Sequence, residues 1–186
     1  MKNKNYKTGY TIIESMISVS VFLIVVMMGM GALLNANLIH EKSEDVRSIM
    51  DNLNFIMEDM SRNLRTGYSY RCYDTEVHIT GDLSIGSPKS CTSGSGVGWG
   101  IAFKHQSGDQ WAYYVGADEK IYKSTDGGAT FIILTPFEVK VDSVSGFSVV
   151  GAEPLPDNKQ PFVTIRIVGT ITSKGVASPF SLQTSV

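Results

Sequence analysis

Two absences mark the first half of this sequence: it has no proline between Tyr10 and Ser87, and no charged side chain from Ser15 to Leu34. Proline breaks the interior of a helix, so its absence allows a long uninterrupted one. The uncharged stretch is strongly apolar and about as long as the ~20 residues that a helix needs to cross a bilayer. The sequence therefore predicts a membrane-spanning helix near its N-terminus.

Histidine and cysteine are scarce, which argues against a metal centre and the common catalytic arrangements. The three histidines, His40, His78 and His105, lie far apart and have no ligand spacing with cysteine or carboxylates. The two cysteines do not form a C-x-x-C pair, and no serine sits in a nucleophile elbow. We therefore expect no enzyme, no cofactor and no metal. The open alternative is calcium bound by three carboxylates in turns, those of Asp118, Glu119 and Asp126.

The charge balance is nearly neutral, with 16 Lys and Arg against 18 Asp and Glu. Basic residues gather only in the prefix 1–9, which contains Lys2, Lys4 and Lys7 and no acid. Nothing electrostatic therefore indicates nucleic acid as a partner. By the positive-inside rule, the prefix is expected to stay cytoplasmic and everything after about Leu38 to lie outside the inner membrane.

The helical pattern continues beyond the apolar stretch. Apolar residues recur at spacings of three, four and seven, which is typical of one stripe on an amphipathic helix; they are Ile39, Val46, Ile49, Met50, Leu53, Ile56, Met57, Met60 and Leu64. We predict a single helix of roughly 55 residues. Its transmembrane and assembly part is expected at 10–37 and its amphipathic part at 38–66. Gly67 is expected to end it as a left-handed C-cap.

After Gly67 the pattern changes to short β-type runs separated by Gly, Asp, Ser and Pro. The predicted strands are 76–80, 100–105, 110–115, 120–123, 130–134, 137–141, 147–150, 162–168 and 180–184. Three prolines mark a loop over 151–160 that cannot be a central strand. Residues 67–186 are therefore predicted to form one antiparallel β-rich head, which together with the helix makes an α+β fold.

The residues around Gly9 form the most specific motif of the chain. The basic prefix ends in Gly9 and is followed by Tyr10-Thr11-Ile12-Ile13-Glu14 and the apolar run. This pattern resembles the class III signal of type IV pilins and type II secretion pseudopilins. The resemblance implies that a prepilin peptidase cuts between Gly9 and Tyr10, that Tyr10 becomes N-methylated, and that Glu14 serves in assembly. Tyr10 stands where the family usually has phenylalanine. A secretory signal peptide and an uncleaved signal anchor are the alternatives.

A broader resemblance covers the segment from Met50 to Gly67 and the plan of a long helix with a β-rich head. It is similar to minor pseudopilins of the J type and to minor pilins of the PilW and ComGF kind. The resemblance implies a single-pass protein of the inner (cytoplasmic) membrane, with its N-terminus cytoplasmic, that enters a pilus or pseudopilus as a structural subunit. The implied partners are prepilin peptidase, other major and minor pilins or pseudopilins, the inner-membrane assembly platform and membrane lipid. The alternative is an adhesin or DNA-uptake minor pilin whose head binds a surface or ligand.

The two cysteines, Cys72 and Cys91, both fall in the part of the chain that is expected outside the membrane. In that oxidising compartment a pair of cysteines forms a disulfide more readily than a metal site. We therefore predict a disulfide between Cys72 and Cys91.

The run Ser124-Thr125-Asp126-Gly127-Gly128-Ala129-Thr130-Phe131 resembles the Asp-box, a hairpin found in sialidases and many β-propellers. There the box is structural and distant from the active site. The residues that match it are Ser124, Asp126, Gly128, Thr130 and Phe131. We expect Asp126 to accept hydrogen bonds from backbone amides, the glycines to permit positive φ, and Phe131 to pack beneath the turn. A sugar-binding role is the alternative.

The leader motif predicts that Gly9 is essential for processing. In a Gly9→Val variant the new Cβ would clash where the peptidase approaches the backbone closely. When this variant is co-expressed with a prepilin peptidase, we expect only the longer precursor on a gel. Efficient trimming of the variant would contradict the assignment of the cleavage site.

Overall fold

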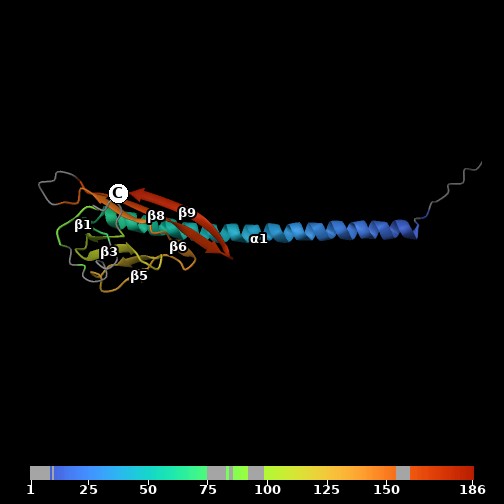
Figure 1. Ribbon diagram of the computed structural model, residues 1–186, viewed down its shortest axis with the longest axis horizontal. Coiled ribbons are helices and arrows are strands. Elements are labelled where there is room, and N and C mark those ends of the chain that lie inside the picture. The colour runs from blue at the N-terminus through green and yellow to red at the C-terminus, as the bar shows by residue number, and fades with distance from the viewer. Residues whose placement is uncertain (1–8, 10, 75–82, 84–85, 92–98, 154–159) are drawn as a thin grey trace, which may run out of the picture. The chain divides into compact units, whose positions relative to one another are not determined.

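The computed structural model describes residues 9, 11–74, 83, 86–91, 99–153 and 160–186. The chain forms two compact units, Met1–Glu44 and Asp45–Val186, and we call the second unit the head. The described elements are one long helix and a set of antiparallel strands (Figure 1). The predicted α+β class is therefore confirmed. The predicted strand at 76–80 lies outside the described residues.

Helix α1 runs from Ile12 to Arg65 and has 54 residues, so the predicted long helix is confirmed. Before Asp45 its large apolar side chains are exposed, except Val26, which is partly buried. Within the head the same helix buries one face, formed by Ile49, Leu53, Ile56, Met57, Met60, Ser61 and Leu64. The helix is thus without charge all round from Ser15 to Leu34 and amphipathic within the head, as the residue pattern indicated.

The end of α1 differs from the prediction. The Gly67 N–H donates to the Leu64 carbonyl at 3.1 Å, but the φ of Gly67 is not positive. The predicted left-handed cap is therefore wrong. A Cβ at residue 67 would collide with the ring of Phe103. Glycine is required here because the end of the helix packs closely on a neighbouring strand, and not because of its own backbone conformation.

The first sheet is an antiparallel meander in which each strand pairs with the next along the chain. Its strands are β1 (Tyr68–Tyr73), β2 (Gly100–Lys104), β3 (Gln110–Val115), β4 (Ile121–Ser124) and β5 (Ile132–Ile133). Residues of β2 and β3 alternate between two apolar environments, because successive side chains of a strand point to opposite faces. Phe103 and Tyr113 belong to the main core, whereas Ala102 and Tyr114 belong to a smaller cluster.

The second sheet is built around its longest strand, β8 (Phe162–Ser173). The other strands are β6 (Val139–Val141), β7 (Gly146–Val150) and β9 (Val176–Ser185). β9 pairs with β8 from Thr164 to Ser173, a range that overlaps the pairings of both β6 and β7 with β8. Since a strand has only two edges, β6 and β7 share the second edge of β8 end to end.

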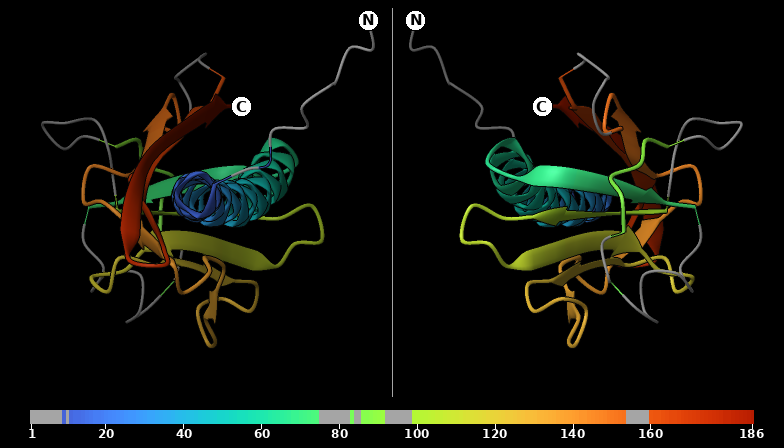
Figure 2. Two further views of the ribbon diagram at one scale, coloured as in Figure 1. Left: turned by 90° about the vertical axis from the view of Figure 1, so that its right-hand side faces the viewer. Right: turned by 90° about the vertical axis from the view of Figure 1, so that its left-hand side faces the viewer.

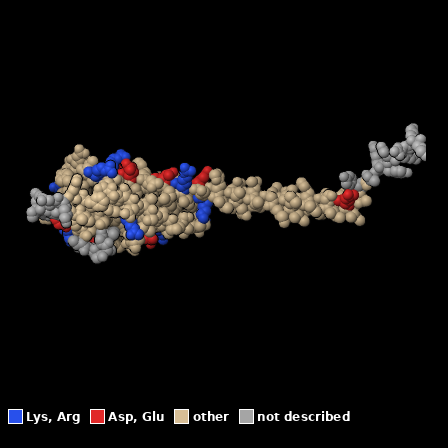
Figure 3. Space-filling model, turned by 90° about the horizontal axis from the view of Figure 1, so that it is seen from above, with Lys and Arg blue, Asp and Glu red and all other residues tan. Residues whose placement is uncertain are grey.

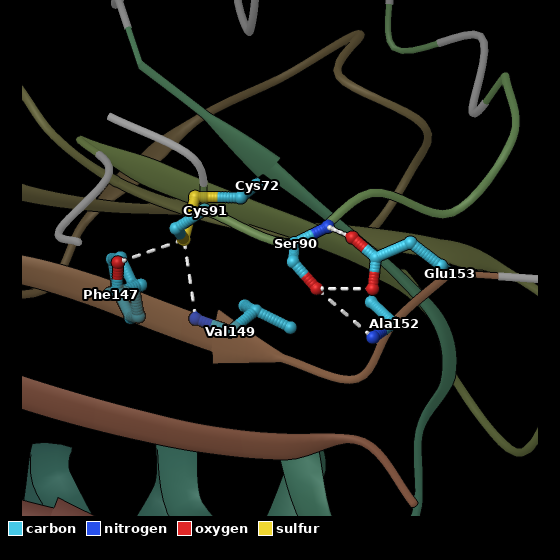
Figure 4. Close-up of a disulfide and its surroundings, with 7 residues drawn as sticks. All are labelled: Cys72, Ser90, Cys91, Phe147, Val149, Ala152 and Glu153. Atoms are coloured by element: carbon cyan, nitrogen blue, oxygen red, sulfur yellow. Dashed lines mark hydrogen bonds between the residues drawn. A yellow bond between two sulfur atoms is a disulfide. The ribbon is translucent and has the colours of Figure 1, made fainter. Parts of the chain in front are cut away.

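A short segment, Lys89–Cys91, connects the two sheets (Figure 4). On one side the Cys72 N–H donates to the Lys89 carbonyl at 3.0 Å, and the Lys89 N–H donates to the Tyr70 carbonyl at 3.1 Å. On the other side the Cys91 N–H donates to the Val149 carbonyl in β7 at 3.0 Å. The predicted disulfide between Cys72 and Cys91 is confirmed and fixes this segment to β1.

The main core lies between the head part of α1 and the inner faces of both sheets, which curve around the helix (Figure 2). Leu53, Met60 and Leu64 on α1 are fully buried in it. The strands contribute Ile101, Phe103, Tyr113, Val115 and Ile121 from the first sheet, and Val139, Val141, Phe147, Val149, Val163, Ile165, Ile167, Ile171 and Phe180 from the second. One helical stripe therefore covers the apolar faces of two sheets.

Polar contacts fix the orientation of the helix in the head. Lys123 Nζ lies 2.8 Å from Asp59 Oδ2 and 4.7 Å from the centre of the Trp111 ring. The Asn63 amide donates to the hydroxyl of Tyr113 at 3.0 Å, and burial raises the pKa of Tyr113. These groups all lie where α1 meets the first sheet.

The second sheet has a matching contact at its hairpin. Lys174 and Gly175 form the two-residue turn between β8 and β9, and both have positive φ, as a type I′ turn requires. The hydroxyl of Ser173 donates to Asp45 Oδ2 at 3.1 Å, and Lys174 Nζ lies 3.8 Å from the same oxygen. Asp45 is the residue at which the helix enters the head.

Most of the predicted strands are present, with shifted boundaries. The predicted strand at 130–134 shortens to Ile132–Ile133, and the one at 137–141 begins later, at Val139, because residues 137–138 form a turn. The strands at 162–168 and 180–184 lengthen to Phe162–Ser173 and Val176–Ser185, since each continues along its partner to the hairpin turn. β1 was not predicted as a separate strand, and Ser69 within it has positive φ beside a shift in register.

Removing the disulfide is expected to destabilise the head. The two cysteines are 19 residues apart, and closing a loop of that size contributes about 3 kcal/mol in the chain-entropy estimate. A Cys72→Ala/Cys91→Ala double variant should lose about that much free energy of unfolding, measured by chemical denaturation. Alkylation without reductant followed by mass spectrometry is the independent check. Two free thiols in wild-type protein purified without reductant would contradict the pairing.

Candidate functional site

The sequence places its most specific site just before α1. Gly9 lies outside the helix and is exposed. Within the part of the chain that the structure describes, no atom lies within 4 Å of a Cβ built on Gly9, beyond its immediate neighbours in the chain. Tyr10, the predicted residue after the cut and the predicted methylation site, lies outside the described residues.

The side chain of Thr11 caps the start of α1. Its hydroxyl oxygen accepts a hydrogen bond from the Glu14 N–H at 3.3 Å. Its carbonyl accepts the first helical bond, from the Ser15 N–H, at 3.2 Å. These are the two properties of an N-cap residue, whose side chain satisfies an amide that has no partner within the helix.

Glu14 lies three residues after the cap and is exposed. It is an acid in the first turn, where the partial positive charge of the helix start favours a carboxylate. The next charged residue along α1 is Glu41. Glu14 is thus an isolated charge at one end of a long apolar surface.

The apolar surface after Glu14 is exposed in the structure. Part of α1 is long and apolar enough to cross a membrane, and none of that stretch is buried. Its visible face in Figure 3 has no Lys, Arg, Asp or Glu. Exposed apolar surfaces of this extent mark contacts with membranes or with other proteins.

The few polar side chains at the start of this surface are satisfied within the helix. The hydroxyls of Ser18 and Ser20 each donate to the carbonyl four residues earlier, at 2.8 Å. Ser15 makes the same type of bond to the Thr11 carbonyl at 3.4 Å. In lipid no water is available to these groups, so bonding to the backbone lets them lie in hydrocarbon.

Sequence reasoning did not identify Thr11 as part of the site, although a signal for it was present. Thr11-Ile12-Ile13-Glu14 is a T-x-x-E sequence directly before an apolar run. That spacing matches the capping box of helix starts, and the structure shows its first half, the bond from the Glu14 N–H to the Thr11 hydroxyl. The same four residues thus contain both the helix start and the carboxylate that was singled out.

The Asp-box-like turn connects β4 to β5 on the outer face of the first sheet. Asp126 Oδ1 accepts from the Thr130 N–H at 3.0 Å and from the Ser124 hydroxyl at 2.8 Å. Gly127 and Gly128 both have positive φ, and a Cβ on Gly128 would collide with the side chain of Leu83. The ring of Phe131 meets that of Tyr114 edge-on, with 5.1 Å between centres. The turn is therefore packed against the sheet.

Hydrogen bonds to Asp126 hold the pKa of its carboxyl at about 2. The largest contribution comes from the Thr130 hydroxyl, followed by the Thr130 N–H and the Ser124 hydroxyl. All three donate to the charged form and therefore stabilise it over the neutral acid. The carboxylate is thus engaged in holding the turn.

The three carboxylates considered for calcium are engaged separately. Asp118 accepts from the hydroxyl of Tyr122 at 2.6 Å, and Glu119 lies 3.2 Å from Lys140 Nζ. Asp126 is held within its own turn. Among the described residues, no group of three or more His, Cys, Asp or Glu is placed to hold a metal ion. The structure therefore lends no support to the calcium alternative at these residues.

An Asp126→Ala substitution is expected to lower the melting temperature of the head by a few degrees at pH 7, because the turn loses its acceptor. The lowered pKa fixes the pH dependence. The stabilisation of the folded head by the Asp126 carboxylate is complete above its unfolded pKa, near 4. It is lost as the pH falls towards about 2. The difference in melting temperature between wild type and variant should therefore shrink as the pH is lowered from about 4 to about 2. Asp142→Ala, at another exposed turn aspartate, is the control. A difference that does not change with pH would contradict this account.

Comparisons of the chain with protein-family models, with curated proteins and with solved structures found no match. Its function is therefore inferred from its own residues. The features that bear on it are Gly9, the capped helix start, the isolated carboxylate of Glu14 and the exposed apolar surface of α1.

Proposed function

We propose that this chain is a minor pilin or pseudopilin, a structural subunit without enzymatic activity. In this proposal a prepilin peptidase removes residues 1–9 at the inner membrane. The mature helix then inserts into a type IV pilus-like or type II secretion fibre, together with other major and minor subunits. The observation that supports it most is the position of Glu14, five residues after Gly9 and at the head of an exposed apolar helix.

The apolar part of α1 supports this proposal because it suits two environments. A helix that is apolar all round requires lipid or other apolar helices around it. Before assembly the bilayer would cover this surface, and in the fibre the helices of neighbouring subunits would do so. The same surface can pass from one environment to the other because both are apolar.

The head supports a location outside the cytoplasm. Its cysteines are joined in a disulfide, and such bonds persist in oxidising compartments. The basic prefix 1–9 favours a cytoplasmic N-terminus and an external head by the positive-inside rule. Export of the head follows from this orientation.

The isolation of Glu14 from other charges supports a role for its carboxylate in assembly. A carboxylate at the bilayer centre costs about 2.5–3.5 kcal/mol. Cleavage after Gly9 creates a positively charged amine on Tyr10, so a neighbouring subunit can present its amine to Glu14. Each charge then neutralises the other, and a slip between helices would leave both without a partner in hydrocarbon.

The test is to replace Glu14 and to score processing and incorporation separately. Glu14→Ala is expected to be cleaved normally, because the carboxylate of Glu14 is proposed to act in assembly and not in cleavage. Incorporation into the pilus or pseudopilus should fall, because the charge pair is lost. Glu14→Gln is the matched control for shape, since it removes only the charge. Variants that are both cut and assembled like wild type would leave charge pairing without support.

A further inference from the structure

We infer that the turn Pro136–Val139 anchors the head on a membrane surface: the exposed ring of Phe137 inserts where the lipid headgroups meet the acyl chains. The inference rests on the proposed function, because it requires that the apolar part of α1 lies in a bilayer. It assigns an interaction surface to the head itself, apart from α1 and from the Asp-box-like turn.

Phe137 is the most exposed large apolar side chain in the described part of the head, with 87% of its surface accessible. A single exposed apolar side chain is ordinary on a protein and does not by itself indicate a partner. The turn that carries this ring, and its place in the head, supply the further evidence.

The backbone of this turn is satisfied by a buried donor rather than left to water. The ammonium of Lys120 donates to the carbonyls of Pro136, Phe137 and Val139, at 2.9, 3.1 and 2.6 Å. These bonds use all three donors of the ammonium group. On an ordinary exposed loop water would serve these carbonyls, whereas an apolar environment requires donors from the chain itself. The turn is therefore suited to apolar surroundings where Phe137 is exposed.

The turn lies at the end of the head where α1 enters. Its fourth carbonyl, that of Glu138, accepts from the Thr172 N–H at 2.9 Å. The next residue, Ser173, donates through its hydroxyl to Asp45 at 3.1 Å, and Asp45 is the first residue of the head. Val176, which pairs with Ser173 across the hairpin, is also exposed. We call this end, with the turn, Ser173 and Asp45, the entry end of the head.

The covalent path keeps the entry end close to the bilayer. The exported part of the chain is expected to begin after about Leu38, and residues 39–44 separate Leu38 from Asp45. As part of the continuous helix α1, this path is about 10 Å long. Asp45 cannot lie farther than that from the end of the membrane-spanning stretch, whatever the tilt of the helix. The polar headgroup region is itself about 5–7 Å deep, so the entry end lies next to it.

Lipid is the partner that this placement favours. The path along the chain brings a bilayer within reach of every membrane-bound copy, whereas a neighbouring subunit is present only after assembly. Charges close to the turn are paired, Lys174 with Asp45 at 3.8 Å and Lys140 with Glu119 at 3.2 Å. The interaction therefore needs no anionic lipid and depends on insertion of the apolar ring, as in proteins that bury phenylalanine at the membrane interface.

The experiment places a fluorescent reporter on the anchor. The full-length protein is reconstituted into phosphatidylcholine vesicles, with and without bromine on the acyl chains, because bromine quenches tryptophan that it contacts. In Phe137→Trp, brominated lipid should remove most of the fluorescence that the variant adds to that of the two native tryptophans. The added emission should also lie at a shorter wavelength than that of tryptophan in water. An unchanged melting temperature shows that the exposed substitution leaves the head folded.

Phe162 provides the matched control. It is an exposed aromatic residue, 52% accessible, and it begins β8, the strand that ends at Ser173. The 12 residues of β8 place its two ends about 36 Å apart, so Phe162 lies far from the entry end. Phe162→Trp should keep its added fluorescence in brominated vesicles.

The outcomes are distinguishable. Release of the wild-type protein from the vesicles by alkaline carbonate would show that α1 does not span the bilayer, which overturns the proposed function. If the protein stays anchored but Phe137→Trp is quenched no more than Phe162→Trp, the inference alone is overturned. A short-wavelength emission from Phe137→Trp without quenching by brominated lipid would mean that protein covers the ring, which also overturns it.

Discussion

The head depends on one stripe of apolar side chains along the second part of α1. Leu53, Met60 and Leu64 are fully buried in a single core that includes residues of both sheets. Fully burying a side chain of this size contributes about 1.5–3 kcal/mol. Both sheets turn their inner faces towards this stripe, so removing it would expose apolar side chains of both. Any process that acts on α1 therefore acts on the element that holds the head together.

Directional contacts then decide how the helix and the sheets are placed around that core. Asp59 and Asn63 bond residues of the first sheet, and Asp45 bonds the hairpin of the second. Between the sheets, the segment Lys89–Cys91 bonds a strand on either side, and the disulfide fixes it. Apolar burial is not directional, so these polar and covalent contacts select one arrangement among those that bury similar area.

The first part of α1 differs from the second, because its apolar surface is exposed and not covered by the described residues of the chain. Under the proposed function that surface is covered by lipid and later by other helices. The four residues from Thr11 to Glu14 lie at the start of this helix. Within them a hydroxyl determines where the helix begins, and a carboxylate supplies an isolated charge.

The sequence by itself determined the long helix, the α+β class and the pairing of the two cysteines. The long helix follows from a local pattern, the apolar periodicity without proline. The disulfide follows because the chain has only two cysteines, which allow only one pairing. It also contained the T-x-x-E signal at Thr11 and the residues of the turn around Asp126. Only the tertiary structure decided that β6 and β7 share one edge of β8 and that Lys89–Cys91 joins the sheets. It alone showed that Gly67 is required by the ring of Phe103 rather than by a left-handed cap. These features depend on residues far apart in the chain. Strand order and close packing are determined by the surfaces that meet in the folded protein, and a local sequence pattern does not encode them.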